Sequence, residues 1–154
     1  ADINLRKSMI FFSFDDKILL EQAIVGREIE CAVLDDGDSL FCPAPGEVIP
    51  HDEFYSYKAK YIDKAGATLK VPAELSQDQA EEVSAIAKAA FKALGCRGMA
   101  RVDFFLPADG LWVLNELNTI PGFTNISLYP QLMLKAGLSY PSLIDKLLQR
   151  AMKN

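Results

Sequence analysis

The stretch 101–128 restricts the fold of this chain more than any other segment of the sequence. Two apolar runs lie on either side of Pro107–Gly110, and the glycine of this turn can adopt the positive φ that tight hairpin loops often need. We therefore predict two antiparallel strands, at about residues 100–106 and 111–118, joined by a loop of four residues. A fold that contains this hairpin has to accommodate an unusual set of polar side chains on a sheet.

Polar side chains of the predicted hairpin share one face of the sheet. Because side chains alternate along a strand, Arg101 projects to the same face as Asp103, and Glu116 to the same face as Asn118. With the short loop, Arg101 lies opposite Glu116, and Asp103 is a diagonal neighbour. The same alternation places three further side chains on this face: Phe105, Trp112 and Leu114. Two carboxylates and a carboxamide are thus expected to converge.

This polar cluster has two interpretations. Asp103, Glu116 and Asn118 offer the oxygen ligands that suit a hard cation such as Mg²⁺. Alternatively, Arg101 and Glu116 form a cross-strand ion pair, and the other two side chains are solvated. The segment that follows favours a ligand site, because its Pro-Gly turn lets the backbone approach a ligand and lets Gly122 present an N–H group.

Three segments carry a resemblance to a known family. Arg-Val-Asp at 101–103, Asn-Glu-Leu-Asn-Thr-Ile-Pro-Gly-Phe-Thr at 115–124 and Ser-Leu at 127–128 resemble the metal- and acceptor-site signature of D-alanine–D-alanine ligases, members of the ATP-grasp superfamily. The resemblance implies that ATP phosphorylates one D-alanine and that the amine of a second attacks the acyl phosphate, for peptidoglycan precursor synthesis. It also implies roles for single residues: Asp103, Glu116 and Asn118 hold Mg²⁺ or Mn²⁺, Arg101 and the Gly122 N–H stabilise oxyanion charge, and Ser127 and the Leu128 N–H hold the acceptor carboxylate.

Nucleotide binding is indicated more weakly near residues 17–34, where two strand candidates, 17–24 and 27–34, meet at a Val-Gly pair. Backbone groups near such a junction are free to meet a flat heterocycle, and a nearby carboxylate can take ribose hydroxyls. Glu28 is otherwise a solvated strand residue. The resemblance implies that the backbone of Glu21–Ile24 faces adenine, that Glu28 holds the ribose, and that Phe105 lines the same cofactor site.

A cluster of aromatic and lysine side chains at 54–61 is either a surface loop fixed by tyrosine side chains or a lid over a nucleotide. By resemblance, Phe54 covers adenine, Lys60 meets phosphate or carboxylate, and Tyr61 helps to close the amino-acid site. Ligases that make a D-Ala-D-lactate ester carry His at the position of Tyr61, so an amino-acid acceptor is favoured. We expect residues 50–63 to form a mobile lid, because their sequence has no strand period and no clear apolar face, so that few buried contacts can hold the segment in place.

The remaining pattern predicts an α+β domain on a mostly antiparallel sheet. Short strands are expected at 40–42 and 47–49, a loop-rich region at 50–73, and helices at 76–94, at 130–136 and from Pro141 onward. Ser76 and Gln79 form a capping box for the first helix. The predicted core stripes are Val83, Ile86, Ala87, Ala90 and Leu94 in this helix, and Leu143, Ile144, Leu147, Leu148 and Ala151 in the last one.

Composition narrows the class of protein. The chain has 154 residues, 50% hydrophobic and 24% charged, which is enough for one domain with a core. A net charge of −5 and a pI near 4.9, without a Lys/Arg block, argue against nucleic acid or an anionic membrane as the principal partner. The 3 cysteines form no Cys-x-x-Cys pair and suit reduced thiols without a chemical role in a cytoplasmic protein.

We expect one domain over residues 1–154, equivalent to the C-terminal ATP-grasp part of a ligase, since no substrate-binding domain and no lysine-bearing lid precede it in the sequence. Such a part is expected to be inactive alone, and a homodimer is expected for the full-length enzyme. Two alternatives stay open: a non-catalytic nucleotide- or metal-binding fragment, and another ATP-grasp ligase that joins a carboxylate to an amine.

Overall fold

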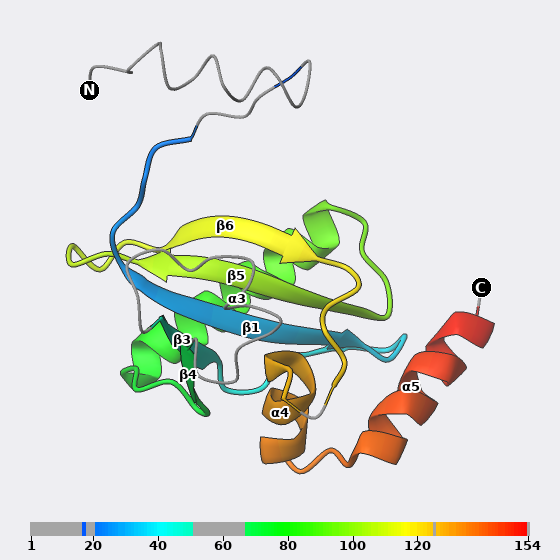
Figure 1. Ribbon diagram of the computed structural model, residues 1–154. Helices are drawn as coiled ribbons and strands as arrows, with labels where there is room; N and C mark the ends of the chain where they lie inside the picture. The colour runs from blue at the N-terminus through cyan, green and yellow to red at the C-terminus, as the bar shows by residue number, and fades with distance from the viewer. Residues whose placement is uncertain (1–16, 18–20, 51–66, 125, 154) are drawn as a thin grey trace.

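The computed structural model describes residue 17 and residues 21–50, 67–124 and 126–153. Within them, six strands form one antiparallel sheet in the order β4-β3-β1-β5-β6, with β2 beside β1 (Figure 1). The strands are β1 (Arg27–Asp35), β2 (Leu40–Phe41), β3 (Gly46–Pro50), β4 (Ala67–Lys70), β5 (Met99–Leu106) and β6 (Val113–Asn118). The helices are α3 (Gln77–Ala93), α4 (Leu128–Lys135) and α5 (Tyr140–Met152). The predicted α+β class is confirmed.

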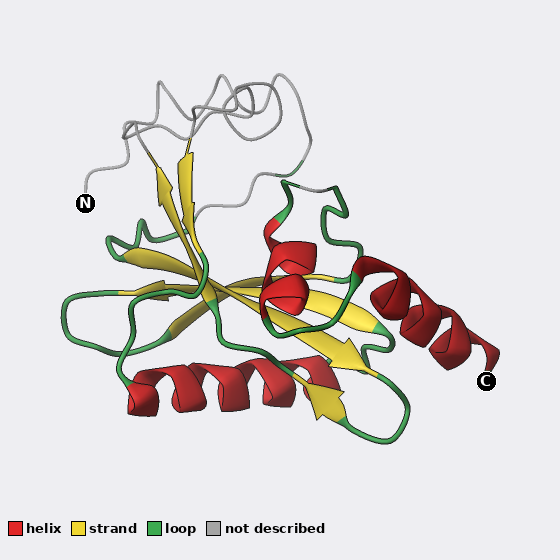
Figure 2. Cartoon of the chain, turned by 90° about the horizontal axis from the view of Figure 1, so that it is seen from below, coloured by secondary structure: helices red, strands yellow, loops and turns green. Residues whose placement is uncertain are grey.

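Strand β1 lies at the centre of the sheet and supplies both of its faces with core residues. Ile29 and Cys31 point to the face covered by α3, and Ala32 and Leu34 point to the face covered by α4. Figure 2 shows the resulting layers, with α3 along one face and α4 on the other. An apolar run buried on both faces is expected for a central strand.

Helix α3 begins as predicted. Ser76 is its N-cap, and both hydrogen bonds of the capping box with Gln79 are formed. Its buried side chains are Val83, Ala87 and Phe91. The predicted stripe is wrong at Leu94, which is 67% exposed because the helix ends at Ala93 and Leu94 is its C-cap.

The hairpin has a different register from the predicted one. Strand β6 begins at Val113, Arg101 lies opposite Asn118, and Asp103 lies directly opposite Glu116. Two shifts of one residue each explain the difference: the turn is one residue longer than predicted, so that Phe105 lies opposite Val113, and β6 contributes one extra residue at a β-bulge next to the Asp103/Phe104 step.

The bulge also changes which face Trp112 uses. The Trp112 ring contacts Phe104 edge-on, with ring centroids 6.0 Å apart, and its Nε1 donates to Glu82 of α3 at 3.1 Å. Trp112 therefore packs on the α3 side, and the prediction that it shares a face with Glu116 is wrong. Leu114, the other apolar side chain predicted there, pairs with Phe104 instead.

Helix α5 is held by Leu143, by the partly buried Leu147 and by polar contacts that the sequence pattern does not reveal. Of its five predicted core residues, only Leu143 is buried, whereas Leu148 is 59% exposed. Arg150 instead forms an ion pair with Asp35 at 2.7 Å, at the end of β1. The apolar period of the helix is real, but the helix lies beside the sheet and not flat against its face (Figure 1).

Three other boundaries differ from expectation. Residues 21–24 are not in a strand, and the rest of the predicted strand 17–24 is too incompletely described to compare. Strand β4 lies in the region expected to be loop-rich, where it is stabilised by pairing with β3. Helix α4 starts at Leu128, before the predicted position 130.

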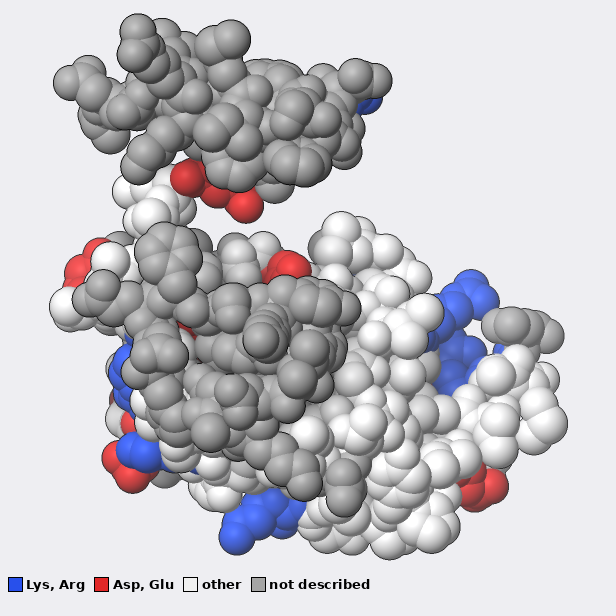
Figure 3. All heavy atoms as spheres, viewed as in Figure 1, with Lys and Arg blue, Asp and Glu red and all other residues white. Residues whose placement is uncertain are grey.

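The surface carries charges of both signs. On the face shown in Figure 3, the described Lys and Arg side chains lie in separate places among Asp and Glu. No helix in the described part of the chain has the length and apolar character needed to cross a bilayer.

Candidate functional site

The α4 face of the sheet changes from apolar to polar along its length. Successive cross-strand pairs of β1 and β5 on this face are Leu34 with Met99, Ala32 with Arg101, Glu30 with Asp103, and Glu28 with Phe105. Helix α4 packs on the apolar end of this series. Beyond it, the side chains are polar, so the site lies on the half of the sheet face that α4 leaves uncovered.

Arg101 is the cationic centre of the site. Its Nε donates to Asp103 Oδ1 at 2.8 Å and lies 3.0 Å from Glu30 Oε2, and its Nη2 donates to Asp103 Oδ2 at 2.6 Å. Burial lowers the pKa of Arg101, but the Asp103 hydrogen bond and the charges of Glu30, Asp103 and Glu116 raise it more, so the pKa lies well above its ordinary value. The guanidinium stays charged.

The three predicted metal ligands converge. Asn118 Nδ2 donates to Glu116 Oε1 at 2.9 Å and to Asp103 Oδ2 at 3.4 Å. The alternative of a cross-strand Arg101–Glu116 pair is not what forms, since Arg101 pairs with Asp103 and Glu30. Nor is Asp103 solvated, because its side chain is only 13% exposed.

The electrostatics around Asp103 favour an additional cation. Burial raises the pKa of Asp103, the nearby Glu116 carboxylate raises it further, and Arg101 opposes both, leaving the pKa above its ordinary value. A raised carboxyl pKa means that the ionised form is incompletely compensated. A cation between Asp103 and Glu116 would supply the missing charge.

The donor set fits Mg²⁺ or Mn²⁺ held jointly with a phosphate ligand. Among the described residues, no three Asp, Glu, His or Cys side chains form a group that could hold a metal. Two carboxylates and one carboxamide suit Mg²⁺ nonetheless, because this ion commonly takes one or two protein carboxylates and completes its shell with phosphates and water. Asn118 presents Nδ2 to the carboxylates, so it would have to turn its amide to offer Oδ1.

The loop after β6 brings Gly122 against Ser127. A Cβ at position 122 would lie 2.9 Å from Ser127 Oγ, so any larger residue would displace the Ser127 side chain. Ser127 is the N-cap of α4, yet its hydroxyl does not cap the helix and instead accepts from Thr124 N at 3.1 Å. The first N–H groups of α4, including that of Leu128, thus have no cap from this side chain and are suited to an anion.

Residues 6–149 match the family model described as "D-ala D-ala ligase C-terminus". The chain belongs to this family. A D-alanine–D-alanine ligase from Oceanobacillus iheyensis is 52% identical over 142 residues, which cover 92% of this chain and 38% of the relative. The chain therefore spans well under half the length of this relative.

Two solved ligase structures resemble the fold. The D-alanine-D-alanine ligase from Coxiella burnetii has a TM-score of 0.80 and 40% identity, over 96% of this chain and 38% of that one. The Bacillus anthracis D-alanine–D-alanine ligase complexed with ATP has a TM-score of 0.78 and 32% identity, over 99% of this chain and 49% of that one. The family and the fold implied by the sequence resemblance are confirmed.

The other predicted ligase residues fall into three groups. Glu28 and Phe105 are cross-strand neighbours on the site face, next to the Glu30–Asp103 pair. Glu21 is exposed and Ile24 half-buried in the segment before β1. Three lie outside the described residues: Phe54, Lys60 and Tyr61. All of these roles, and those of the predicted lid at 50–63, stay predictions.

Glu30 belongs to the site but was not among the predicted residues. Its carboxylate lies 3.0 Å from Arg101 Nε and is largely buried. The strand alternation that places Glu28 on the site face also places Glu30 there. That signal was available in the sequence.

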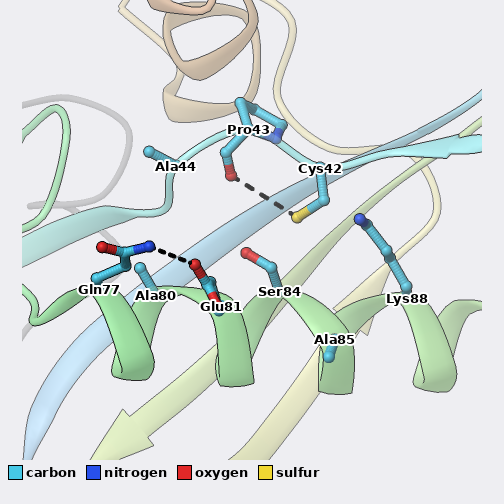
Figure 4. A pocket seen from close by; sticks show the side chains of 9 residues that line it. All are labelled: Cys42, Pro43, Ala44, Gln77, Ala80, Glu81, Ser84, Ala85 and Lys88. Carbon is cyan, nitrogen blue, oxygen red and sulfur yellow. Dashed lines mark hydrogen bonds between the residues drawn. The ribbon is translucent and has the colours of Figure 1, made fainter.

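A hollow of about 440 Å³ between the β2–β3 link and α3 contains no predicted site residue (Figure 4). Its lining is Cys42, Pro43, Ala44, Gln77, Ala80, Glu81, Ser84, Ala85 and Lys88. A hydrogen bond with Cys31 lowers the pKa of Cys42 and burial raises it; with contributions from Ser84 and Lys88, the pKa lies below its ordinary value. This hollow faces the α3 side and is separate from the polar cluster.

Proposed function

We propose that this chain provides the ATP- and metal-binding part of a D-alanine–D-alanine ligase, which joins two D-alanines through an acyl phosphate for peptidoglycan precursor synthesis. One observation carries the proposal: Arg101, Asp103, Glu116 and Asn118 meet on the half of the sheet face that α4 does not cover, in a chain of the ligase family. The solved relative that was crystallised with ATP supports the choice of nucleotide.

Asp103, Glu116 and Asn118 are the residues that would hold Mg²⁺ or Mn²⁺. The ion would neutralise phosphate charge during transfer to the first D-alanine. Arg101 then holds Asp103 in place through two hydrogen bonds, and Glu30 restrains Arg101 from the neighbouring strand. On the same face, Glu28 and Phe105 would meet the nucleotide, together with the backbone of Glu21–Ile24.

Arg101 and the Gly122 N–H would stabilise the oxyanion charge that develops when the second D-alanine attacks. Arginine has five N–H donors, and the contacts with Asp103 and Glu30 involve Nε and Nη2, so Nη1 can face the developing charge. A donor of this kind typically contributes about 3 kcal/mol to transition-state stabilisation. Ser127 Oγ and the Leu128 N–H would hold the acceptor carboxylate, with Phe54, Lys60 and Tyr61 closing over the reactants.

The acceptor is an amino acid in this proposal, and D-serine is the competing choice to be tested beside D-alanine. We infer that the full-length enzyme acts in the cytoplasm, where its small-molecule substrates are, and that it forms a homodimer. No nucleic acid or membrane partner is proposed.

The test is a chimeric ligase, defined as the Oceanobacillus iheyensis relative with its matching segment replaced by this chain. It should release phosphate from ATP when D-alanine is added and should form the dipeptide. Nucleotide binding without turnover would favour the non-catalytic module. Turnover with a different carboxylate and amine would favour another ATP-grasp ligase.

A further inference from the structure

Tyr140, at the start of α5, contacts the loop that carries the proposed acceptor site. Its hydroxyl donates to the Phe123 carbonyl oxygen at 2.8 Å, and the two rings are 5.3 Å apart between centroids. Phe123 also packs against Tyr129, with ring centroids 6.1 Å apart. The residue next to Gly122 is thus held by an aromatic cluster that no residue of the polar site belongs to.

The contact acts on one peptide unit from both sides. The Phe123 carbonyl and the Thr124 N–H belong to the same planar peptide group. Tyr140 donates to the carbonyl oxygen, and Ser127 Oγ accepts from the N–H at 3.1 Å. Rotation of this peptide plane would break both hydrogen bonds together, so Tyr140 fixes the direction from which Ser127 Oγ is engaged.

The hydrogen bond from the 123–124 peptide leaves the Ser127 hydroxyl able to donate its proton to an anion. Its Oγ accepts from Thr124 N and lies 2.9 Å from Thr124 Oγ1. When the threonine hydroxyl donates as well, both lone pairs of Ser127 are used, and its own proton is free to point to a carboxylate. Gly122 passes close to the same side chain, since a Cβ at this position would lie 2.9 Å from Ser127 Oγ.

Tyr140 is itself held in place from both ends of α5. Ser139 caps the helix by accepting from Ser142 N at 3.3 Å, which fixes the first turn. Near the other end, Arg150 pairs with Asp35 at 2.7 Å. Helix α5, which has one buried side chain, is therefore joined to the sheet by the Arg150–Asp35 ion pair and to the loop by Tyr140. It lies beside α4 in Figure 1.

We propose that Tyr140 is a positioning residue for the acceptor amino acid, acting through the 123–124 peptide on Ser127 and Gly122. The proposal rests on the proposed function for the identity of the ligand, a D-amino acid carboxylate. Tyr140 does not touch the reacting atoms; its hydroxyl sets the orientation of groups that do.

The kinetic test compares Tyr140→Phe with Tyr129→Phe in the chimeric ligase. Both changes remove one hydroxyl from the same aromatic cluster, but the Tyr129 hydroxyl donates to Val33 in the core and not to the loop. Tyr140→Phe should raise the KM of the acceptor site about three- to tenfold, the loss of one hydrogen bond, with the KM for ATP unchanged. Tyr129→Phe should lower thermal stability and leave the acceptor KM as it is.

A double-substitution cycle asks whether Tyr140 acts through Ser127. With Ser127→Ala already present, Tyr140→Phe should change the acceptor KM less than twofold. If the effects of the two substitutions on the acceptor KM multiply, Tyr140 acts independently of Ser127, and the proposal is overturned.

A second measurement does not need activity. In this chain, hydrogen exchange of the Thr124 amide should become about three- to tenfold faster in Tyr140→Phe and stay unchanged in Tyr129→Phe. Unchanged exchange in Tyr140→Phe would overturn the positioning role even if the chimera is active. Faster exchange in a chimera without turnover would keep the role of Tyr140 in the loop and reject the ligase reaction.

Discussion

Replacing Glu116 by Gln separates a ligand site from a structural ion pair. Glu116 is exposed, and its carboxylate accepts a hydrogen bond from Asn118 Nδ2 at 2.9 Å, which the amide oxygen of glutamine can still accept. The substitution removes repulsion from Asp103 and breaks no ion pair with Arg101. We therefore expect the free energy of unfolding to change by less than about 0.5 kcal/mol.

Cation binding should respond far more strongly to the same change. Two unit charges about 4 Å apart interact by about 4 kcal/mol at an effective dielectric constant near 20. Exposure of Glu116 to solvent reduces this value, so we expect at least a tenfold loss of Mg²⁺-dependent ATP affinity and a loss of turnover in the chimera.

Calorimetric titration with ATP and Mg²⁺, together with thermal unfolding, measures both quantities. Glu81→Gln is the matched control, because it makes the same charge change at an exposed position on α3, across the sheet from the site. Unchanged Mg²⁺-dependent affinity in Glu116→Gln would refute its role as a ligand. A loss of more than about 2 kcal/mol of stability would show that the cluster is structural.

Three further predictions concern other parts of the chain. Gly122→Ala should weaken acceptor binding at least tenfold in the chimera, because the new methyl would lie 2.9 Å from a hydroxyl of the site; steady-state kinetics measures this. Burial raises the pKa of Asp35, but hydrogen bonds from Arg150 and two backbone N–H groups lower it more, so the folded pKa lies below the ordinary value. The ionised Asp35 therefore stabilises the fold fully above the unfolded pKa of about 4, and this stabilisation is lost as the pH falls through the lower folded pKa. Arg150→Gln should flatten that acid limb in chemical denaturation between pH 2 and 5, and an unchanged limb would contradict the ion pair. Phe91→Ala should cost about 3 to 5 kcal/mol of unfolding free energy, and Leu94→Ala less than about 1, since the first is 1% and the second 67% exposed.

Local signals in the sequence were sufficient for much of the fold. The capping box at Ser76 placed the start of α3 correctly because both of its hydrogen bonds are made within four residues. Helix α5 shows the limit: its apolar period exists, but which element covers it depends on the path of the chain in three dimensions.

The sequence predicted which residues form the candidate site better than it predicted how they are arranged. Strand parity placed Asp103 and Glu116 on one face, and the structure agrees. The β-bulge next to Asp103 could not be inferred from apolar periodicity, and together with a turn one residue longer than predicted it changed the cross-strand partner of Arg101 from Glu116 to Asn118. Glu30 shows the reverse case, a site residue that strand alternation alone could have identified.

The most direct test of the central claim is paramagnetic broadening of amide signals in this chain by Mn²⁺ with millimolar ATP. Broadening falls off steeply with distance from the ion, so it identifies the residues that surround it. The account predicts that the signals of Asp103, Glu116 and Asn118 disappear first and that those of Glu81 and Lys88, beside the hollow on the α3 side, persist. Broadening centred on α3, or uniform weak broadening with no centre on β5 and β6, would contradict it.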